Sequence, residues 1–384
     1  MAIDLFGKPV GGFPEFKLNL QQKRQATLLY HWMSLDYLRD LKSLIDALIK
    51  GADVNLELAK LQGRDALLTN ERWGVRDTSA NWSTFVFPAL EDFRKATIKD
   101  IAKRAAESYE FTGATQCSRM IDEFSSMWMT EEEEKRFKEQ FDKVYHHAQF
   151  IDFAAGIGGR RNQLSDSSMA EYWLELAHLF PKLPRFRVRT DVEAVTGKRP
   201  ARTGVYVAQN DQYAALQFAW VGNEDGVLGV AETLNDTGRR LIAAIGRDAM
   251  WVDGEKMANY AIEAFKRGEL TDRGGFDPGS ESDPRFVGSV LSQMSETTRA
   301  SKWYFVERVE GEFDDDQADR EAPTVTPTSA TLRCEANQPC PREGYWFTPA
   351  RPNSRRAFQQ GEAMPDVGGT YGATIWQWDE QQGP

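Results

Sequence analysis

Apolar residues recur mostly at steps of three and four between Asn19 and Ile49, and this spacing predicts one long amphipathic helix. Gly51 is expected to end that helix, because glycine is common just past a helix C-terminus. Similar spacing predicts four further helices, over residues 85–109, 115–129, 130–150 and 169–180. The helix over 130–150 opens with Thr130 and Glu133, which have the spacing of a capping box. The first half of the chain is therefore predicted to be a helical layer.

After Pro184 the apolar period changes to two, which predicts strands. Three strand segments, FRVRTDVEAV, GVYVAQ and YAALQFAWVG, are followed by a turn-like NEDG and by VLGVAETL. Helical spacing returns in two segments that start at Asp236 and Asp253, and KWYFVERVEGEF is a further strand. The predicted fold class is α+β, with a helical N-terminal half packed on a C-terminal half that contains an antiparallel sheet.

Composition shifts divide the chain into regions. Acidic residues gather after the last of these strands and are followed by Pro and Thr, as in a solvated loop. The helical region and the mixed region are expected to pack as one unit. The expected regions are a helical region over 1–183, a mixed α/β region over 184–310, an acidic, Pro/Thr-rich loop or linker over 311–330, and a closing β module over 331–384.

The overall charge narrows the class of partner. The chain has 384 residues, a formal net charge of -11 and a pI near 5.1. This charge disfavours nonspecific binding to nucleic acid or to an anionic membrane and suits a basic partner. The N-terminal residues do not resemble a signal peptide, and no stretch approaches the ~20 apolar residues that span a bilayer. A cytoplasmic protein is expected, with neither nucleic acid nor a membrane as partner.

Residues that commonly carry catalysis or bind metals show no informative spacing. Four histidines fall within predicted helices and lack the spacing of a zinc site. Three cysteines do not form a disulfide framework and are expected to be buried thiols. AAGIGGRR lacks the order of a nucleotide-binding loop and is interpreted as a helix end with a basic turn. We expect no catalytic residue, metal ligand or cofactor. The histidines and cysteines are His31, His146, His147, His178, Cys117, Cys334 and Cys340.

The closing module is dense in aromatic residues. GYWF and TIWQW suit two strands whose rings pack on one face. Arg355 and Arg356 are expected to stack on these rings or to pair with Glu362 and Asp379. We favour a packed core for the cluster, while an exposed stacking surface made by its tryptophans stays open. Those tryptophans are Trp346, Trp376 and Trp378.

The same module carries a resemblance. CPREGYWFTP, SRRAFQQGEAMP and YGATIWQWD resemble the C-terminal signature of predicted immunity proteins of bacterial polymorphic toxin systems, in the immunity protein seventy-one and seventy-two families. The resemblance covers about the last fifty residues, in the same motif order. It implies a nonenzymatic cytoplasmic protein that binds and neutralises a cognate toxin domain, with interbacterial competition through type VI secretion as the expected setting. It implies no catalytic residue.

Glu312, Asp314, Asp315 and Asp316 form the densest run of charge on the chain. Such a run is most often a solvated linker, but it can also meet a surface rich in Lys and Arg. We therefore name these four carboxylates as candidate residues for binding a basic toxin. Two other functions remain open: a carbohydrate- or peptide-binding module that uses the C-terminal tryptophans, and an enzyme with an unrecognised site between the helices and the sheet.

Overall fold

The computed structural model describes residues 16–68, 74–156, 166–247, 249–268, 291, 294–314, 333–348, 351, 354–367 and 374–379. The chain divides into two units, Met1–Asp315 and Asp316–Pro384. The boundary between them falls within the segment 311–330 that composition marks as a loop or linker. Helices dominate the first part of the chain and antiparallel strands dominate the rest, so the fold class is α+β.

The stretch predicted as one N-terminal helix forms two helices, α1 (Leu20–Trp32) and α2 (Leu35–Leu61). The break lies at Ser34, whose hydroxyl accepts a hydrogen bond from the backbone N–H of Tyr37 at 3.2 Å and donates to the carbonyl oxygen of His31 at 2.7 Å. A serine in this position begins a new helix, because its side chain satisfies a backbone donor that has no partner within the helix. The apolar spacing continues across the break and therefore concealed it.

Gly51 does not end a helix, contrary to the sequence prediction, and lies inside α2. A Cβ atom on Gly51 would lie 3.1 Å from the side-chain oxygen of Gln140 in the neighbouring helix α6. Most real Cβ contacts are longer than this, so the glycine leaves room for the side chain of Gln140 beside α2. Close packing accounts for the residue better than helix termination does.

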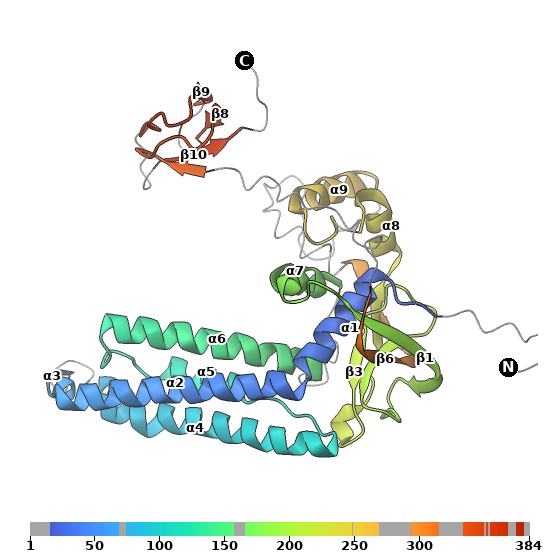
Figure 1. The fold of residues 1–384 in the computed structure, drawn as a ribbon, viewed down its shortest axis with the longest axis horizontal. Coiled ribbons are helices and arrows are strands. Elements are labelled where there is room, and N and C mark those ends of the chain that lie inside the picture. Colours follow the sequence, from blue (N-terminus) through green and yellow to red (C-terminus); the bar gives the residue numbers. More distant parts are fainter. Residues whose placement is uncertain are drawn as a thin grey trace, which may run out of the picture. The chain divides into compact units, whose positions relative to one another are not determined.

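The helices α2, α4 (Ser79–Lys103) and α6 (Glu131–Ala155) lie side by side as a bundle (Figure 1). The buried positions of α2 alternate between steps of three and four, which is the spacing of a coiled-coil seam. The linking helices α3 (Arg64–Leu68) and η1 (Gly74–Asp77) lie between α2 and α4 in sequence, and α5 (Ala114–Glu123) packs against α4 and α6. The buried seam of α2 consists of Leu38, Leu41, Ile45, Leu48, Ala52, Asn55 and Ala59.

The predicted capping box of α6 is confirmed. The hydroxyl of Thr130 accepts from the N–H of Glu133, and the carboxylate of Glu133 accepts from the N–H of Thr130 at 2.9 Å. The helix ends at Ala155 and is followed by Gly156 with φ of 78°, so the start of AAGIGGRR does terminate a helix. Its basic turn lies outside the described residues. The next helices are α7 (Asp166–Leu176) and the short η3 (Ala177–Leu179).

The larger sheet of the first unit has the strand order β1-β6-β2-β3, and every pairing is antiparallel. Its members are β1 (Pro184–Val195), β2 (Gly204–Ala208), β3 (Gln217–Ala219) and β6 (Lys302–Phe313). Alternate residues of β2 enter different cores: Val205 and Val207 join the core of the helical bundle, whereas Tyr206 and Ala208 join a second cluster on the other face. One hydrophobic core therefore runs from the bundle onto the sheet.

Smaller elements complete the first unit. The strands β4 (Ala231–Leu234) and β5 (Glu296–Arg299) pair antiparallel, and η4 (Glu224–Gly226) precedes them. The helices α8 (Asp236–Ile245) and α9 (Gly254–Lys266) pack on each other and on β4 through small apolar clusters.

The second unit contains a four-stranded antiparallel sheet in the order β7-β10-β8-β9. Its strands are β7 (Arg333–Glu335), β8 (Gly344–Phe347), β9 (Arg356–Phe358) and β10 (Ile375–Trp378). The predicted GYWF and TIWQW strands are confirmed as β8 and β10. A small core of Cys334, Cys340, Trp346, Phe358, Met364 and Trp376 fills this unit.

Asp152 is a carboxylate buried where α6 meets the loop before α5. Its two oxygens accept the N–H of Thr112 at 2.8 Å and the hydroxyl of Thr112 at 2.9 Å. Burial raises the pKa of Asp152 to about 6 despite these hydrogen bonds. The folded state therefore favours the protonated carboxyl, so its contribution to stability is greatest below about pH 4 and is lost as the pH rises through 6, by on the order of 2–3 kcal/mol.

We predict that Asp152→Asn removes this pH-dependent loss. An amide can accept from the N–H of Thr112 and donate to its hydroxyl without a buried charge. Between pH 4.5 and pH 7.5, the unfolding free energy of the variant should increase relative to that of the wild type. Urea unfolding followed by helical circular dichroism measures it. A difference that stays constant over this range would show that Asp152 does not titrate as proposed.

Candidate functional site

The acidic run named from the sequence is partly built into the fold. Glu312 belongs to β6, not to a linker, and its carboxylate pairs with Arg185 of β1 at 2.9 Å. Asp314 follows the strand, pairs with Lys23 of α1 at 2.8 Å and donates its backbone N–H to the carbonyl oxygen of Leu183. Residues 311–313 fall in both the predicted strand KWYFVERVEGEF and the predicted loop over 311–330, and the structure confirms the strand, since β6 ends at Phe313. Asp315 and Asp316 lie outside the described residues.

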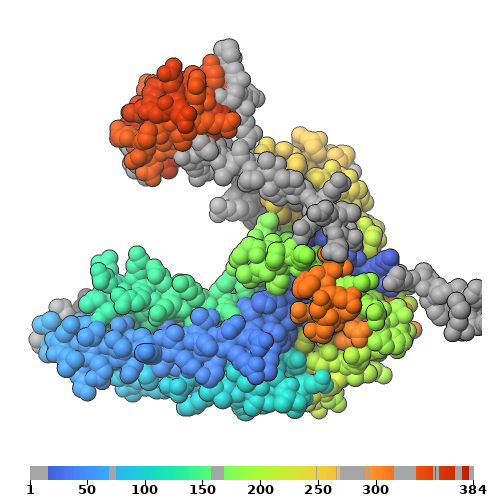
Figure 2. All heavy atoms as spheres, in the orientation of Figure 1, coloured from blue at the N-terminus to red at the C-terminus, as the bar shows by residue number. Residues whose placement is uncertain are grey.

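A second surface gathers at the end of the bundle that carries α3, and we call it the bundle end. Figure 2 shows this end, with α2 in blue and α6 in green, projecting away from the sheet of the same unit. Large apolar side chains are exposed here, and the most exposed, Leu61 and Leu67, keep 80% and 74% of their surface in solvent. Scattered single apolar residues are ordinary on protein surfaces, whereas a contiguous patch marks a contact surface, so these residues make the bundle end a candidate contact surface. The group consists of Val54, Leu58, Leu61, Leu67, Val75 and Met127.

A polar framework holds the bundle end in place. The guanidinium of Arg64 binds both carboxylate oxygens of Glu133, at 2.5 and 2.9 Å, and donates to the carbonyl oxygen of Trp128 at 3.0 Å. Arg64 lowers the pKa of Glu133 through this hydrogen-bonded pair. The carboxylate of Asp65 accepts from the backbone N–H of Ser79 at 2.7 Å, at the start of α4. The exposed apolar residues therefore sit on connected elements.

The bundle end carries exposed charged residues as well as apolar ones, with the cations Lys60 and Arg76 beside the carboxylates of α6. Four consecutive glutamates open α6 beside Met127, and the first two, Glu131 and Glu132, are exposed. Glu133 forms an ion pair with Arg64, and Glu134 forms one with Lys138 at 2.5 Å. Sequence reasoning did not select this surface, although one signal was available: Val54, Leu58 and Leu61 are apolar residues of α2 that lie off its buried seam.

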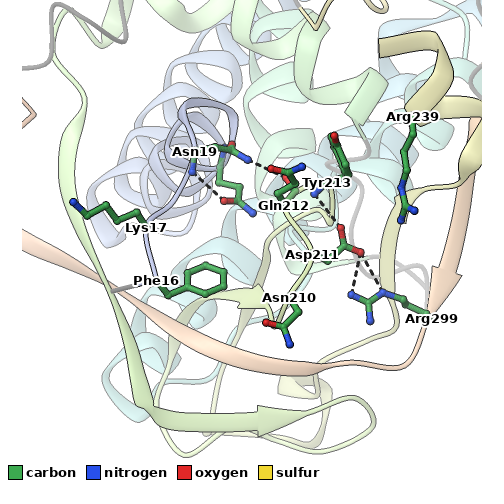
Figure 3. Close-up of a pocket in the computed structure, with 10 residues that line it drawn as sticks. Phe16, Lys17, Asn19, Asn210, Asp211, Gln212, Tyr213, Arg239 and Arg299 are labelled. Carbon is green, nitrogen blue, oxygen red and sulfur yellow. Dashed lines mark hydrogen bonds and ion pairs between the residues drawn. The ribbon is translucent and has the colours of Figure 1, made fainter. Parts of the chain in front are cut away.

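A polar pocket of ≈ 650 Å³ lies where α1 begins, beside the loop after β2 (Figure 3). Three cationic side chains line it: Lys17 before α1, Arg239 from α8 and Arg299 from the end of β5. Asp211 is the one carboxylate among the described lining residues, and it faces Arg299. The rest of the lining consists of Phe16, Asn19, Gln22, Asn210, Gln212 and Tyr213.

Asp211 is already fully engaged in this pocket. Its carboxylate pairs with Arg299 at 3.0 Å and accepts the backbone N–H groups of Tyr213 and Ala214 at 3.0 and 3.1 Å, as the dashed lines in Figure 3 show in part. The side-chain amide of Asn19 donates to the carbonyl oxygen of Gln212 at 2.9 Å. Among the described lining residues, this one carboxylate thus serves the loop structure, and three side chains are cationic.

The C-terminal tryptophans form a core, as favoured from the sequence. Trp346 and Trp376 are 0% and 1% exposed, and their indole N–H groups donate to the carbonyl oxygens of Arg342 and Pro365. Trp378 is half-buried against Trp346. Buried rings with satisfied N–H groups cannot present a stacking face to a ligand. The open alternative of an exposed surface therefore fails for Trp346 and Trp376.

The arginines of this unit cover its aromatic residues. Arg355 lies over the ring of Tyr345 at 4.2 Å and pairs with Asp379, and Arg356 lies over the rings of Phe358 and Trp376. Both predicted roles of Arg355, stacking and pairing, are confirmed, and stacking is confirmed for Arg356. These guanidinium groups shield the small core from water.

The histidines and cysteines occupy structural positions. His147 stacks on the ring of Tyr37 at 3.7 Å and contacts its carbonyl oxygen at 2.9 Å, and His146 pairs with Glu175. The three cysteines are buried free thiols, as predicted. Within the described ranges, no three His, Cys, Asp or Glu side chains are grouped so that they could hold a metal ion. None of the helices in the described part of the chain is long and apolar enough to cross a bilayer.

Comparisons with models of protein families, with curated proteins and with solved structures find no match to this chain.

Proposed function

We propose that the chain is an immunity protein that binds a cognate toxin domain and thereby neutralises it, without catalysis of its own. The motif order of the C-terminal module supports this proposal through its resemblance to immunity protein families. The bundle end supports it from the structure, because exposed apolar side chains and carboxylates meet there on a connected framework. That combination is the single observation that favours a protein partner most strongly.

The chemistry of the bundle end defines the partner. Apolar residues at the centre of an interface supply affinity when they are desolvated. The exposed carboxylates of Glu131 and Glu132 favour a partner surface with Lys and Arg at its rim. We therefore propose a basic toxin domain with an apolar patch. The formal net charge of -11 on the whole chain adds long-range attraction to such a partner.

The acidic run has a separate role in this proposal. The ion pair of Glu312 with Arg185 is exposed, so it contributes little to stability and leaves the carboxylate of Glu312 within reach of an approaching partner. Replacing Glu312, Asp314, Asp315 and Asp316 with Gln or Asn should slow association with the toxin and flatten its salt dependence. Stopped-flow fluorescence at low and high salt measures both. An unchanged association rate at low salt would mean that the acidic run has only a structural role.

Growth rescue tests the function directly. The probe is the C-terminal toxin domain encoded beside the gene for this chain, expressed in a bacterium that lacks both proteins. Co-expression of the full chain should restore growth, and co-expression of an unrelated acidic protein of similar size should not. Continued growth arrest in the presence of the folded chain would contradict the proposal.

The two other functions gain less support. Burial of Trp346 and Trp376 removes most of the proposed stacking surface for a carbohydrate or peptide. For an enzyme, the pocket of Figure 3 offers Asp211 as its only described carboxylate, and that group already accepts hydrogen bonds from Arg299 and two backbone N–H groups. An engaged carboxylate is a poor general base.

A further inference from the structure

The pocket at the start of α1 contains a hydrogen-bond donor that the protein itself does not use. Gln22 is 3% exposed, and its side-chain oxygen accepts the backbone N–H of Asn19 at 3.1 Å in the capping box of α1. The amide nitrogen Nε2 of Gln22 is buried and has no hydrogen-bond partner among the residues that the structure describes. Buried donors are nearly always satisfied, so this nitrogen points to an acceptor supplied from outside the chain.

The charges around this donor identify the kind of acceptor. Lys17, Arg239 and Arg299 line the pocket from three separate segments, and Figure 3 shows the guanidinium of Arg299 against Asp211, whereas the ammonium of Lys17 points away from both arginines. The opposing carboxylate of Asp211 is held by Arg299 and by the backbone of its own loop. Arg239 also lies 5.9 Å from the ring of Tyr213 and 3.6 Å from the exposed carboxylate of Asp236. Guanidinium and amide donors together suit an oxyanion.

The N-terminus of α1 does not create this site by itself. Asn19 and Gln22 already cap the helix, and each satisfies a backbone N–H group of its first turn or cap. The unpaired donor and the two arginines are independent observations, because the donor arises from packing of α1 and the arginines come from α8 and β5. A concave site lined by a few placed polar groups is typical of small-molecule pockets.

We infer that this pocket binds a small organic anion that carries phosphate or carboxylate groups. Gln22 donates to an oxygen of that ligand through Nε2, and Arg239 and Lys17 supply charge at the rim. Arg299 keeps Asp211 from repelling the ligand. The inference does not rest on the proposed function of the chain, since no feature of the bundle end enters it.

A single substitution separates the ligand contact from the helix cap. Gln22→Glu keeps an oxygen for the N–H of Asn19, because glutamate serves the same position of a capping box. It replaces the donor with an oxygen and adds a negative charge to the pocket. The variant should fold as the wild type does and bind an anion at least about tenfold more weakly.

Isothermal titration of the full chain with sodium pyrophosphate, ATP and sodium citrate at constant ionic strength tests the inference. The wild type should bind at least one probe, with the phosphate probes and citrate distinguishing the two anion classes. Arg239→Gln should weaken binding as Gln22→Glu does. Arg240→Gln, a neighbouring exposed arginine outside the pocket lining, is the matched control and should bind as the wild type.

Two results would overturn the inference. One is no binding of any of the three probes to the folded wild type. The other is equal binding by the wild type, Gln22→Glu and Arg239→Gln, which would place the anions elsewhere on the chain. If Gln22→Glu proves unstable, Arg239→Gln and its neighbour Arg240→Gln decide the question, because Arg239 is half exposed and its loss leaves the core unchanged.

Discussion

Replacing Trp346 with alanine is expected to unfold the C-terminal unit and to leave the helical bundle folded. Trp346 is fully buried among Cys334, Phe358, Met364 and Trp376, and its indole N–H donates to a backbone carbonyl oxygen. Truncation of a buried Trp costs about 3–5 kcal/mol. A unit with so small a core has little stability to lose, so this cost is expected to exceed its free energy of unfolding.

Limited trypsin digestion of the full chain, followed by mass spectrometry, measures this effect. In the variant, peptides from 333–379 should appear rapidly while a fragment covering 16–314 persists. Trp378→Ala is the control, because this residue is half-buried and its loss should leave the unit folded. A Trp346→Ala protein whose C-terminal unit resists digestion as the wild type does would contradict the core assignment and revive a binding role for the aromatic cluster.

The double substitution Leu61→Lys and Met127→Lys is expected to weaken binding of the proposed toxin domain by at least about 100-fold. Both side chains are mostly exposed, at 80% and 65%, so the bundle should remain folded. In the complex, each apolar contact at an interface centre is worth on the order of 1–2 kcal/mol, and each new lysine repels a basic partner. Isothermal titration with the purified toxin domain gives the affinity.

Ile98→Lys provides the control for these substitutions. Ile98 is an exposed apolar residue of α4, and it lies roughly 28 Å along that helix from the first residue, Ser79, at the bundle end. This variant should bind the toxin as tightly as the wild type. Equal loss of affinity in Ile98→Lys and in the double variant would mean that overall charge, and not the bundle end, controls binding.

Sequence patterns located most of the helices and strands because amphipathic periodicity reports directly on which side chains are buried. The α6 start was predictable from Thr130 and Glu133, since a capping box is local chemistry. The break at Ser34 was not, because the buried residues on both sides keep the same spacing. The prediction that Gly51 ends the helix was wrong for a related reason. Packing against Gln140 is a tertiary contact that no local sequence pattern records.

The candidate surfaces were less predictable than the fold. The acidic run was visible in the sequence, but its pairing with Arg185 and Lys23 depends on strand register and on the placement of α1. The bundle end joins residues from α2, α3, η1 and the loop before α6, and the pocket joins α1, α8 and β5. Convergence of distant segments is a property of topology, so spacing along the chain cannot reveal it.

Hydrogen–deuterium exchange on the full chain with the proposed toxin domain tests most directly whether the bundle end binds this partner. We expect toxin-dependent protection in peptides covering 54–68 and 127–134, with the C-terminal unit unchanged. Long-range electrostatic attraction needs no lasting contact. Residues 302–314 should therefore show little toxin-dependent protection. Protection confined to 333–379 or to the pocket around Gln22, with none at the bundle end, would contradict the account.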